Sequence, residues 1–300
     1  MTTMTDQARP RTAPRRRRWV RRLVITLAVL LGLTVVADFS AAAIFEYQVS
    51  KRARNQFNLA DDPSVKVGGF SFIAQALSGE YDHVSIDARG VPVRDTLRDL
   101  EVHVELMGVQ APLGDLVSGS LQEVKVREVE GQVRVKASDV SRALHEIDNP
   151  LLQSLTNLTI DPVTEQDART DPDDRTDEEE EAAEAAEELE TDDDTTAGAR
   201  LCAATDIGGD ETDFCAFGII SLVDAKATFL PTRLELRNEV LGIGELSDEF
   251  QASLLSGLTG FTLDPGELPF TVTPTAVDVS AGVLSVKGKA TNVVLGGSGG

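Results

Sequence analysis

The feature that most constrains this chain is an uncharged apolar run near its N-terminus, preceded by a cluster of arginines. The run covers residues 23–37 (LVITLAVLLGLTVVA), and six arginines lie among the eight residues before it. A helix of this length is about 22 Å long, which is shorter than the ~30 Å hydrocarbon core of a bilayer. Because arginines favour the cytoplasmic side, the chain after the run is expected outside the cell membrane.

Two interpretations of the run remain open. It is either a cleaved signal peptide, with small residues for a peptidase at 41–43, or an uncleaved anchor that also uses residues 39–45. The anchor has to tolerate Asp38 near one membrane interface. In both cases residues 1–22 form a basic cytoplasmic N-terminus, and the body lies in the cell envelope on the extracytoplasmic side.

A long helix is predicted directly after the run. One apolar residue recurs at every fourth position: Ala41, Phe45, Val49, Ala53 and Phe57. Charged residues, including Lys51, Arg52 and Arg54, fall on the other side, as in an amphipathic helix. The helix should end before Pro63, because proline disfavours helical geometry in the residue that precedes it.

The body shows alternation of apolar with polar or charged residues, which is typical of antiparallel sheet with one solvated face. The clearest alternating segments are 84–89, 100–106, 123–127, 132–137, 233–237, 277–280 and 284–287. A tight hairpin is expected at 130–131 and short helices at 139–147 and 247–255. The predicted fold class is α+β, in which a curved, mainly antiparallel sheet wraps the long amphipathic N-terminal helix.

Residues 161–200 are of a different composition. Residues 161–198 contain eighteen acidic residues against two arginines, with few large apolar groups, so the segment cannot bury enough surface to offset ordering entropy. We expect an acidic disordered insertion between a first domain part, 38–160, and a second part, 201–295. It lacks the glycine-containing spacing of a calcium loop. Residues 296–300 should form a flexible tail.

The sequence offers little for catalysis. Cys202 and Cys215 are predicted to form a disulfide in an oxidising compartment, with two unpaired buried thiols as the alternative. The three histidines fall on different predicted elements, and the G-x-S-x-G match at 296–300 has no helix after it. We therefore predict no enzyme activity, no catalytic residue, no metal and no cofactor. Outside residues 1–22 and 161–198 the net charge is −13, which argues against nucleic acid as a partner.

The most distinctive block is residues 65–86 (VKVGGFSFIAQALSGEYDHVSI). Glycines flank an apolar cluster made of Phe70, Phe72, Ile73, Ala76 and Leu77. The cluster has two interpretations: a plug that closes one end of the core, or an apolar lip where acyl chains enter.

The order of segments resembles the actinobacterial LmeA-like family of cell-envelope phospholipid-binding proteins. The resemblance is carried by the basic and apolar N-terminus, the V-x-V-G-G-F-x-F-x-x-Q-x-L-x-G-x-x-x-x-V-x-I block, the L-P-F element at 268–270 and two strands divided at 281–282. It covers residues 38–295 apart from the acidic segment. It implies a fold related to tubular lipid-binding domains, binding of phospholipids such as phosphatidylinositol, and a supporting role in lipoglycan synthesis. The family offers no catalytic residue.

A curved sheet that meets a helix with small side chains leaves an apolar groove for acyl chains. The candidate lining residues are Ala41, Phe45, Val49, Ala53, Phe57, Phe70, Phe72, Ile73 and Leu77. The candidate head-group rim is Lys51, Arg52 and Arg54. An ordinary close-packed core is the rival interpretation of the same stripe. The leading hypothesis is an exported, membrane-associated phospholipid carrier or accessory factor. The alternative is a membrane-tethered structural domain whose acidic loop recruits a basic partner.

Overall fold

The structure is a computed structural model of the chain. It describes residues 15–93, 97–118, 124–146, 150–169, 195–207, 210–223, 226–237, 262–263 and 272–295. Several predicted features lie outside these residues: the helix at 247–255, the L-P-F element at 268–270, the tail at 296–300 and most of the acidic segment.

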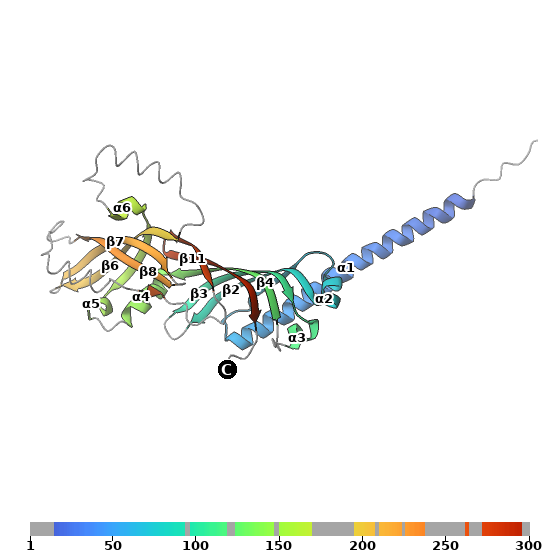
Figure 1. Cartoon of the computed structure of the whole chain (residues 1–300), viewed down its shortest axis with the longest axis horizontal. Coiled ribbons are helices and arrows are strands. Elements are labelled where there is room, and N and C mark those ends of the chain that lie inside the picture. The colour runs from blue at the N-terminus through green and yellow to red at the C-terminus, as the bar shows by residue number, and fades with distance from the viewer. Residues whose placement is uncertain are drawn as a thin grey trace, which may run out of the picture.

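The described chain contains helices and two antiparallel sheets (Figure 1). The helices are α1 (Arg15–Phe57), α2 (Phe72–Ser78), α3 (Leu113–Ser118), α4 (Ala137–His145), α5 (Pro150–Gln153) and α6 (Glu165–Arg169). The first sheet has the order β1 (Ser64–Gly68), β2 (Glu80–Val93), β3 (Leu97–Gln110), β4 (Val124–Lys136), β11 (Val283–Leu295) and β10 (Thr273–Ser280). The second has the order β5 (Thr156–Pro162), β6 (Thr196–Ile207), β7 (Asp210–Val223), β8 (Lys226–Arg237) and β9 (Thr262–Leu263). The α+β class is confirmed, with two sheets where one was expected.

The apolar run and the amphipathic segment form one continuous helix, α1, of 43 residues. Its N-terminal half projects from the body, and its C-terminal half lies along the first sheet (Figure 1). The helix ends at Phe57, as predicted, and Asn58 then takes a positive φ of 51°. The amide of Leu59 donates to the carbonyl of Arg54 at 3.0 Å, which closes the last turn.

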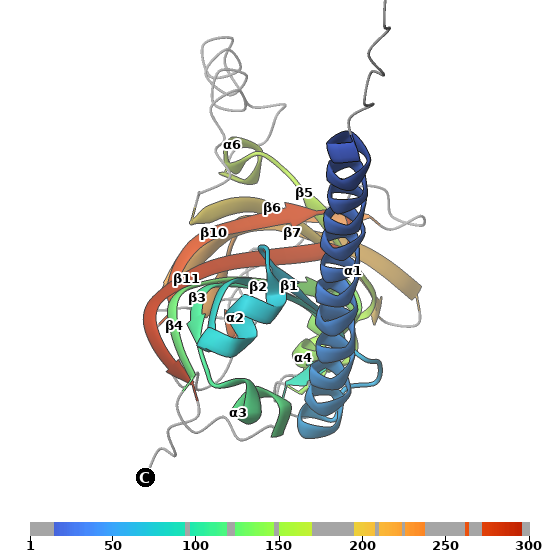
Figure 2. The ribbon, with the colours of Figure 1, turned by 90° about the vertical axis from the view of Figure 1, so that its right-hand side faces the viewer.

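The first sheet curls around an interior, and α1 lies along its open side (Figure 2). The apolar members of the alternating strands share the inner face because cross-strand partners lie on one side of a sheet. Val84 pairs with Leu106, and Leu106 pairs with Val129. The polar members of the strands lie on the outer face. The predicted wrapping of a sheet around the helix is therefore confirmed for this sheet.

The hairpin expected at 130–131 was wrong: β4 runs straight through, and Gly131 pairs with Val104 on one side and Gly288 on the other. The buried residues Val126 and Val129 are three positions apart, so the alternation changes phase within one strand. One residue in each of the four central strands is left out of the regular pairing. These residues form a row across the sheet: Asp82, Gly108, Arg127 and Asn292. Gly108 and Asn292 have positive φ values of 65° and 53°, which absorb the change of phase.

The second sheet packs against the far end of the first. The predicted disulfide is confirmed: Cys202 on β6 and Cys215 on β7 are bonded and directly opposite each other in the ladder. Both ends of the segment predicted as an acidic insertion lie in strands. Residues 161–162 belong to β5 and 196–200 to β6, and Asp161 pairs with Arg200 across these strands at 3.1 Å. The C-terminal end of the acidic segment contributes to the core, because its small residue Ala199 is fully buried.

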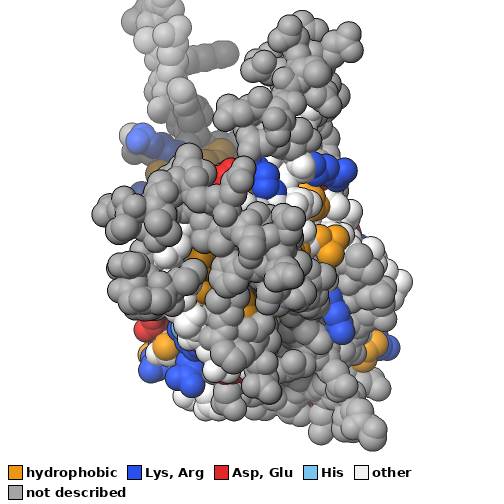
Figure 3. All heavy atoms as spheres, turned by 90° about the vertical axis from the view of Figure 1, so that its left-hand side faces the viewer, with side chains coloured by type: hydrophobic (Ala, Val, Ile, Leu, Met, Phe, Trp, Pro, Cys, Tyr) orange, Lys and Arg blue, Asp and Glu red, His pale blue; other side chains and the backbone are white. Residues whose placement is uncertain are grey.

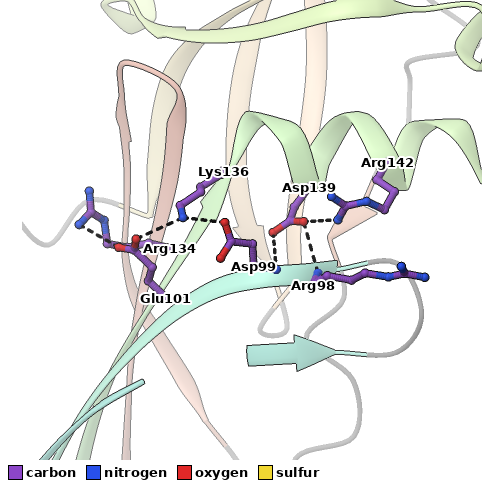
Figure 4. Close-up of polar contacts among 7 residues, drawn as sticks. All are labelled: Arg98, Asp99, Glu101, Arg134, Lys136, Asp139 and Arg142. Atoms are coloured by element: carbon purple, nitrogen blue, oxygen red, sulfur yellow. Dashed lines mark hydrogen bonds and ion pairs between the residues drawn. The ribbon is translucent and has the colours of Figure 1, made fainter. Parts of the chain in front are cut away.

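Helix α4 starts at Ala137 and ends at His145, two residues earlier at each end than predicted. Its Asp139 carboxylate is fully buried and accepts hydrogen bonds from the amides of Arg98 at 3.3 Å and Asp99 at 3.1 Å, and it also pairs with Arg142 (Figure 4). The carboxylate thus ties α4 to the first residues of strand β3. On the outer face of the first sheet nearby, the Lys136 amine forms an ion pair with a carboxylate oxygen of Asp99 at 2.7 Å (Figure 4).

Candidate functional site

The inner face of the first sheet carries two buried clusters, one at each end. The α1 cluster joins helix α1 to α2 and the strands, and its buried members are Phe45, Phe72, Tyr81, Leu106, Val109, Ala111, Val124, Val126, Val129, Ala290 and Val293. The intersheet cluster joins the two sheets and α4, and includes Leu100, Val135, Val140, Leu144, Leu201, Phe214, Phe229 and Leu284. Both are ordinary cores by their burial.

Three aromatic rings form the centre of the α1 cluster. The ring centroid of Phe45 lies 5.3 Å from that of Phe72 and 6.1 Å from that of Tyr81. The predicted cluster in 65–86 therefore serves in part as a plug, with Phe72 buried against α1. Tyr81 was missed by sequence reasoning. A sequence signal for the burial of Tyr81 is weak, because Tyr81 lies three residues before Val84. An odd spacing does not fit the period-two alternation of β2.

The Tyr81 hydroxyl is buried and has no hydrogen-bond partner within the described chain. Burial raises the pKa of this phenol above its usual value, because the ionised form loses its hydration. A buried polar atom without a partner is uncommon in native proteins and needs an explanation.

Between the two clusters lies a continuous set of apolar side chains that are only half buried. We call it the inner strip, and it consists of Ile86, Val102, Val104, Val133 and Val286. The register places them side by side: Ile86 pairs with Val104, and Val133 pairs with both Val102 and Val286. Ile86 and Val104 touch the α1 cluster, whereas Val102, Val133 and Val286 touch the intersheet cluster. The strip is therefore apolar surface that connects the two cores without complete packing.

Gly131 lies at the centre of the inner strip. It occupies the inner-face position between Val104 and Gly288, and a Cβ built on it would meet no atom of the described chain within 4 Å. A glycine in the middle of a strand usually marks a close approach of another group. Here no atom of the described residues approaches, so the reason for this glycine is not a close contact within the described chain.

The nine residues predicted to line a groove fall into two groups. Phe45 and Phe72 are buried, and the small or medium residues Ala41, Val49 and Ala53 are half buried. The remaining four are exposed on the outside of the body: Phe57, Phe70, Ile73 and Leu77. The structure thus brings the helix stripe together with the sheet, but places these four side chains in solvent.

The predicted head-group rim is largely neutralised within the protein. The Lys51 amine lies 2.6 Å from an Asp62 carboxylate oxygen, and Arg54 lies 3.4 Å from the other. The hydrogen bond from Lys51 holds the pKa of the Asp62 carboxyl below its usual value. Arg52 is exposed, and no ion pair within the described residues includes it. Of the three, Arg52 is the candidate with its charge available.

The structure also has a groove lined mainly by polar side chains of β2, β3 and β4 and of the segment after α1. This groove of about 730 Å³ is lined by Asp61, Asp62, Ser64, Asp87, Ala88, Arg89, Glu101, Val102, His103, Gln132 and Arg134. His103 is hydrogen-bonded to Asp87 at 2.6 Å, which raises the pKa of the imidazole, and lies 3.4 Å from Glu105. The acidic lining disfavours an anionic ligand. In the part of the chain that the structure describes, no group of three metal-ligating side chains occurs.

The segment Trp19–Asn55 of α1 is long and apolar enough to cross a membrane. A signal sequence also meets this criterion. Fold and inner face together define a class of protein in which an apolar N-terminal helix fronts a curled sheet with an apolar interior. The chain matches the family described as LmeA-like phospholipid-binding over residues 36–289, and it belongs to this family. Comparison with curated proteins and with solved structures gave no match.

Proposed function

We propose that this protein is an exported, membrane-associated phospholipid-binding protein. It acts without catalysis, as a carrier or accessory factor in the maintenance of envelope lipids and lipoglycans. Membership of the phospholipid-binding family supports the ligand class. The apolar N-terminal helix and the Cys202–Cys215 disulfide support an oxidising, extracytoplasmic location.

The observation that carries the proposal is the inner strip with Gly131 at its centre. An acyl chain laid over these side chains would complete the burial of Val102, Val104 and Val133. Each buried methylene contributes about 0.8 kcal/mol, so a dozen methylenes contribute about 10 kcal/mol before ordering costs. This driving force requires no charged or catalytic group, in agreement with the apolar character of the strip.

The test uses two glycines at which an added Cβ would meet no atom of the described residues within 4 Å. Gly131→Trp would fill the inner strip, whereas Gly114→Trp places the same side chain at an exposed position of α3. Each full-length variant is purified in mild detergent and extracted with organic solvent, and the phospholipid is quantified by mass spectrometry. Wild type and Gly114→Trp should retain equal phospholipid, and Gly131→Trp should lose most of it.

Circular dichroism and an intact disulfide serve as controls for folding in all three proteins. Equal phospholipid in a folded Gly131→Trp variant would overturn the strip as the binding site. A wild type that carries no phospholipid, yet captures a basic partner through residues 161–200, would overturn the carrier in favour of the membrane-tethered interaction domain.

A further inference from the structure

Helix α2 and the residue before its cap present apolar side chains to solvent. Phe70 is 70% exposed, Leu77 is 83% exposed and Ile73 is 37% exposed. We call these three the α2 face. The opposite side of the same helix is packed, with Phe72 and Gln75 buried. A soluble surface rarely groups large apolar side chains in this way without a partner.

The α2 face is held rigidly to the long helix. The Asp38 carboxylate on α1 is only 3% exposed and accepts hydrogen bonds from the amides of Phe72 at 2.9 Å and Ile73 at 2.8 Å. The Ser71 hydroxyl donates to the same carboxylate. On the other side, the amide of Asp82 donates to the Gln75 side chain at 3.0 Å. Both α1 and β2 therefore fix the position of α2.

The position of this contact along α1 matters. The uncharged run 23–37 ends one residue before Asp38, and it spans about 22 Å of a ~30 Å hydrocarbon core. The missing apolar length has to come from neighbouring groups. Beyond Asp38, α1 exposes Phe39 and Ile44 at 66% and 60%. The α2 face lies at the same level of the helix, next to the contact with Asp38.

We propose that the α2 face inserts into the outer boundary of the bilayer that α1 spans, at the level where head groups meet acyl chains. Asp38 sets this depth by fixing α2 to the membrane helix. The partner is the lipid surface itself. The inference rests on the membrane attachment in the proposed function, and it adds a second contact with the same leaflet. Interfacial apolar segments lie about 5–10 Å into this boundary.

The arrangement orients the whole body. Helices α2 and α3 lie at the end of the curled sheet from which the N-terminal half of α1 projects (Figure 1). A groove of about 670 Å³ between them, lined in part by Leu77, Leu113 and Lys125, belongs to this end. Among the described side chains visible at the opposite end of the molecule, Lys and Arg lie beside small hydrophobic areas (Figure 3). The α2 end therefore faces the leaflet.

The test measures the depth of single labels in the full-length chain, reconstituted into vesicles of phosphatidylcholine and phosphatidylglycerol. The only native cysteines are bonded to each other, so Leu77→Cys provides a unique site for an environment-sensitive fluorophore. Leu30→Cys labels the apolar half of α1. Ala281→Cys labels the exposed β10–β11 turn, which is tied to β5 by a 2.7 Å bond from Gly282 to Ile160.

The label at position 77 should show blue-shifted emission and be quenched most by lipids spin-labelled near the head group. The label at position 30 should be quenched most by lipids spin-labelled deep in the chain, and the label at 281 by neither. Quenching at 30 but not at 77 would overturn the α2 contact and leave the membrane attachment intact. Absence of quenching at 30 would instead overturn the attachment on which both proposals rest.

Asp38→Ala in the Leu77→Cys background tests the role of the carboxylate. Loss of the hydrogen bonds to α2 should reduce quenching at position 77, with quenching at position 30 unchanged. Unchanged quenching at 77 would show that Asp38 does not set the depth. The intact Cys202–Cys215 disulfide and the circular dichroism spectrum report that the body of the variant is folded.

Discussion

Tyr81 shows how a single atom distinguishes a core from a binding site. Its ring is packed against Phe45, while its hydroxyl has no partner in the described chain. An unsatisfied buried hydroxyl costs about 1–3 kcal/mol, so Tyr81→Phe should raise the free energy of unfolding of the lipid-free protein by about 1 kcal/mol. Chemical denaturation after delipidation measures this change.

The same variant separates two roles for the hydroxyl. If a bound lipid supplies the missing acceptor, Tyr81→Phe should hold less phospholipid than wild type in spite of its higher stability. If the lipid-free Tyr81→Phe variant were less stable than the lipid-free wild type, the Tyr81 hydroxyl would have to make a hydrogen bond within the protein. Phe72→Leu, which alters the same cluster without touching a polar atom, is the matched control.

His103 gives the groove of about 730 Å³ that it lines a dependence on pH. Hydrogen bonding to Asp87 raises the pKa of the imidazole above about 6.5, the value of an unperturbed histidine. The interaction stabilises the fold fully below pH 6.5 and is lost as the pH rises through the higher folded pKa. Because the side chain is 40% exposed, solvent screening keeps the effect small.

NMR titration of the His103 ring should therefore give a pKa above 6.5, and Asp87→Asn should lower it. His103→Gln should remove this contribution to the loss of stability as the pH rises above 6.5. A ring pKa below 6.5 in the wild type would show that desolvation outweighs the two carboxylates.

At the scale of elements, α4 depends on one buried carboxylate. The Asp139 carboxylate accepts hydrogen bonds from the amides of Arg98 and Asp99 and forms an ion pair with Arg142. Asp139→Ala leaves the amides of Arg98 and Asp99 without their acceptor, and an unsatisfied buried donor costs about 1–3 kcal/mol, so the variant should be destabilised by about 3 kcal/mol. Lys136→Ala removes an exposed ion pair with Asp99 and should cost less than about 1 kcal/mol. Urea denaturation of both variants compares them, and equal losses would contradict the structural role of Asp139.

The elements also show what the sequence could and could not predict. The end of α1 and the outward charges of the strands follow from local pattern, because proline and period-two alternation act within a few residues. The continuity of β4 does not. Gly131 and the shift between Val126 and Val129 read locally as a turn. In the fold, Gly108 and Asn292 on the neighbouring strands absorb the shift, and single-sequence alternation holds no information on pairing.

The candidate site was predictable to a similar degree. Period-four spacing identified the helix stripe, and Phe45 is buried as a member of it. The inner strip was not identified as a site, because its valines look identical to other inward-facing strand residues. Only the register shows that Val102, Val133 and Val286 meet between two cores and remain half buried.

At the scale of the whole molecule, the structure bears on the two interpretations of the N-terminus. Cleavage at 41–43 would remove Asp38 and leave the amides of Phe72 and Ile73 and the Ser71 hydroxyl without their acceptor. Because these donors lie at the start of a helix that packs on α1, a cleaved protein would lose the contact that orients α2.

We therefore expect α1 to remain uncleaved in the mature protein. Intact mass spectrometry of the protein extracted from its native membranes should show a chain that retains residues 23–43. Alkaline carbonate should leave it in the membrane fraction, since a spanning helix resists extraction whereas a peripheral protein does not. A mature chain that begins near residue 44 and is released by carbonate would contradict the anchor. It would also require another acceptor for the amides of α2, which a structure of the shortened chain would have to show.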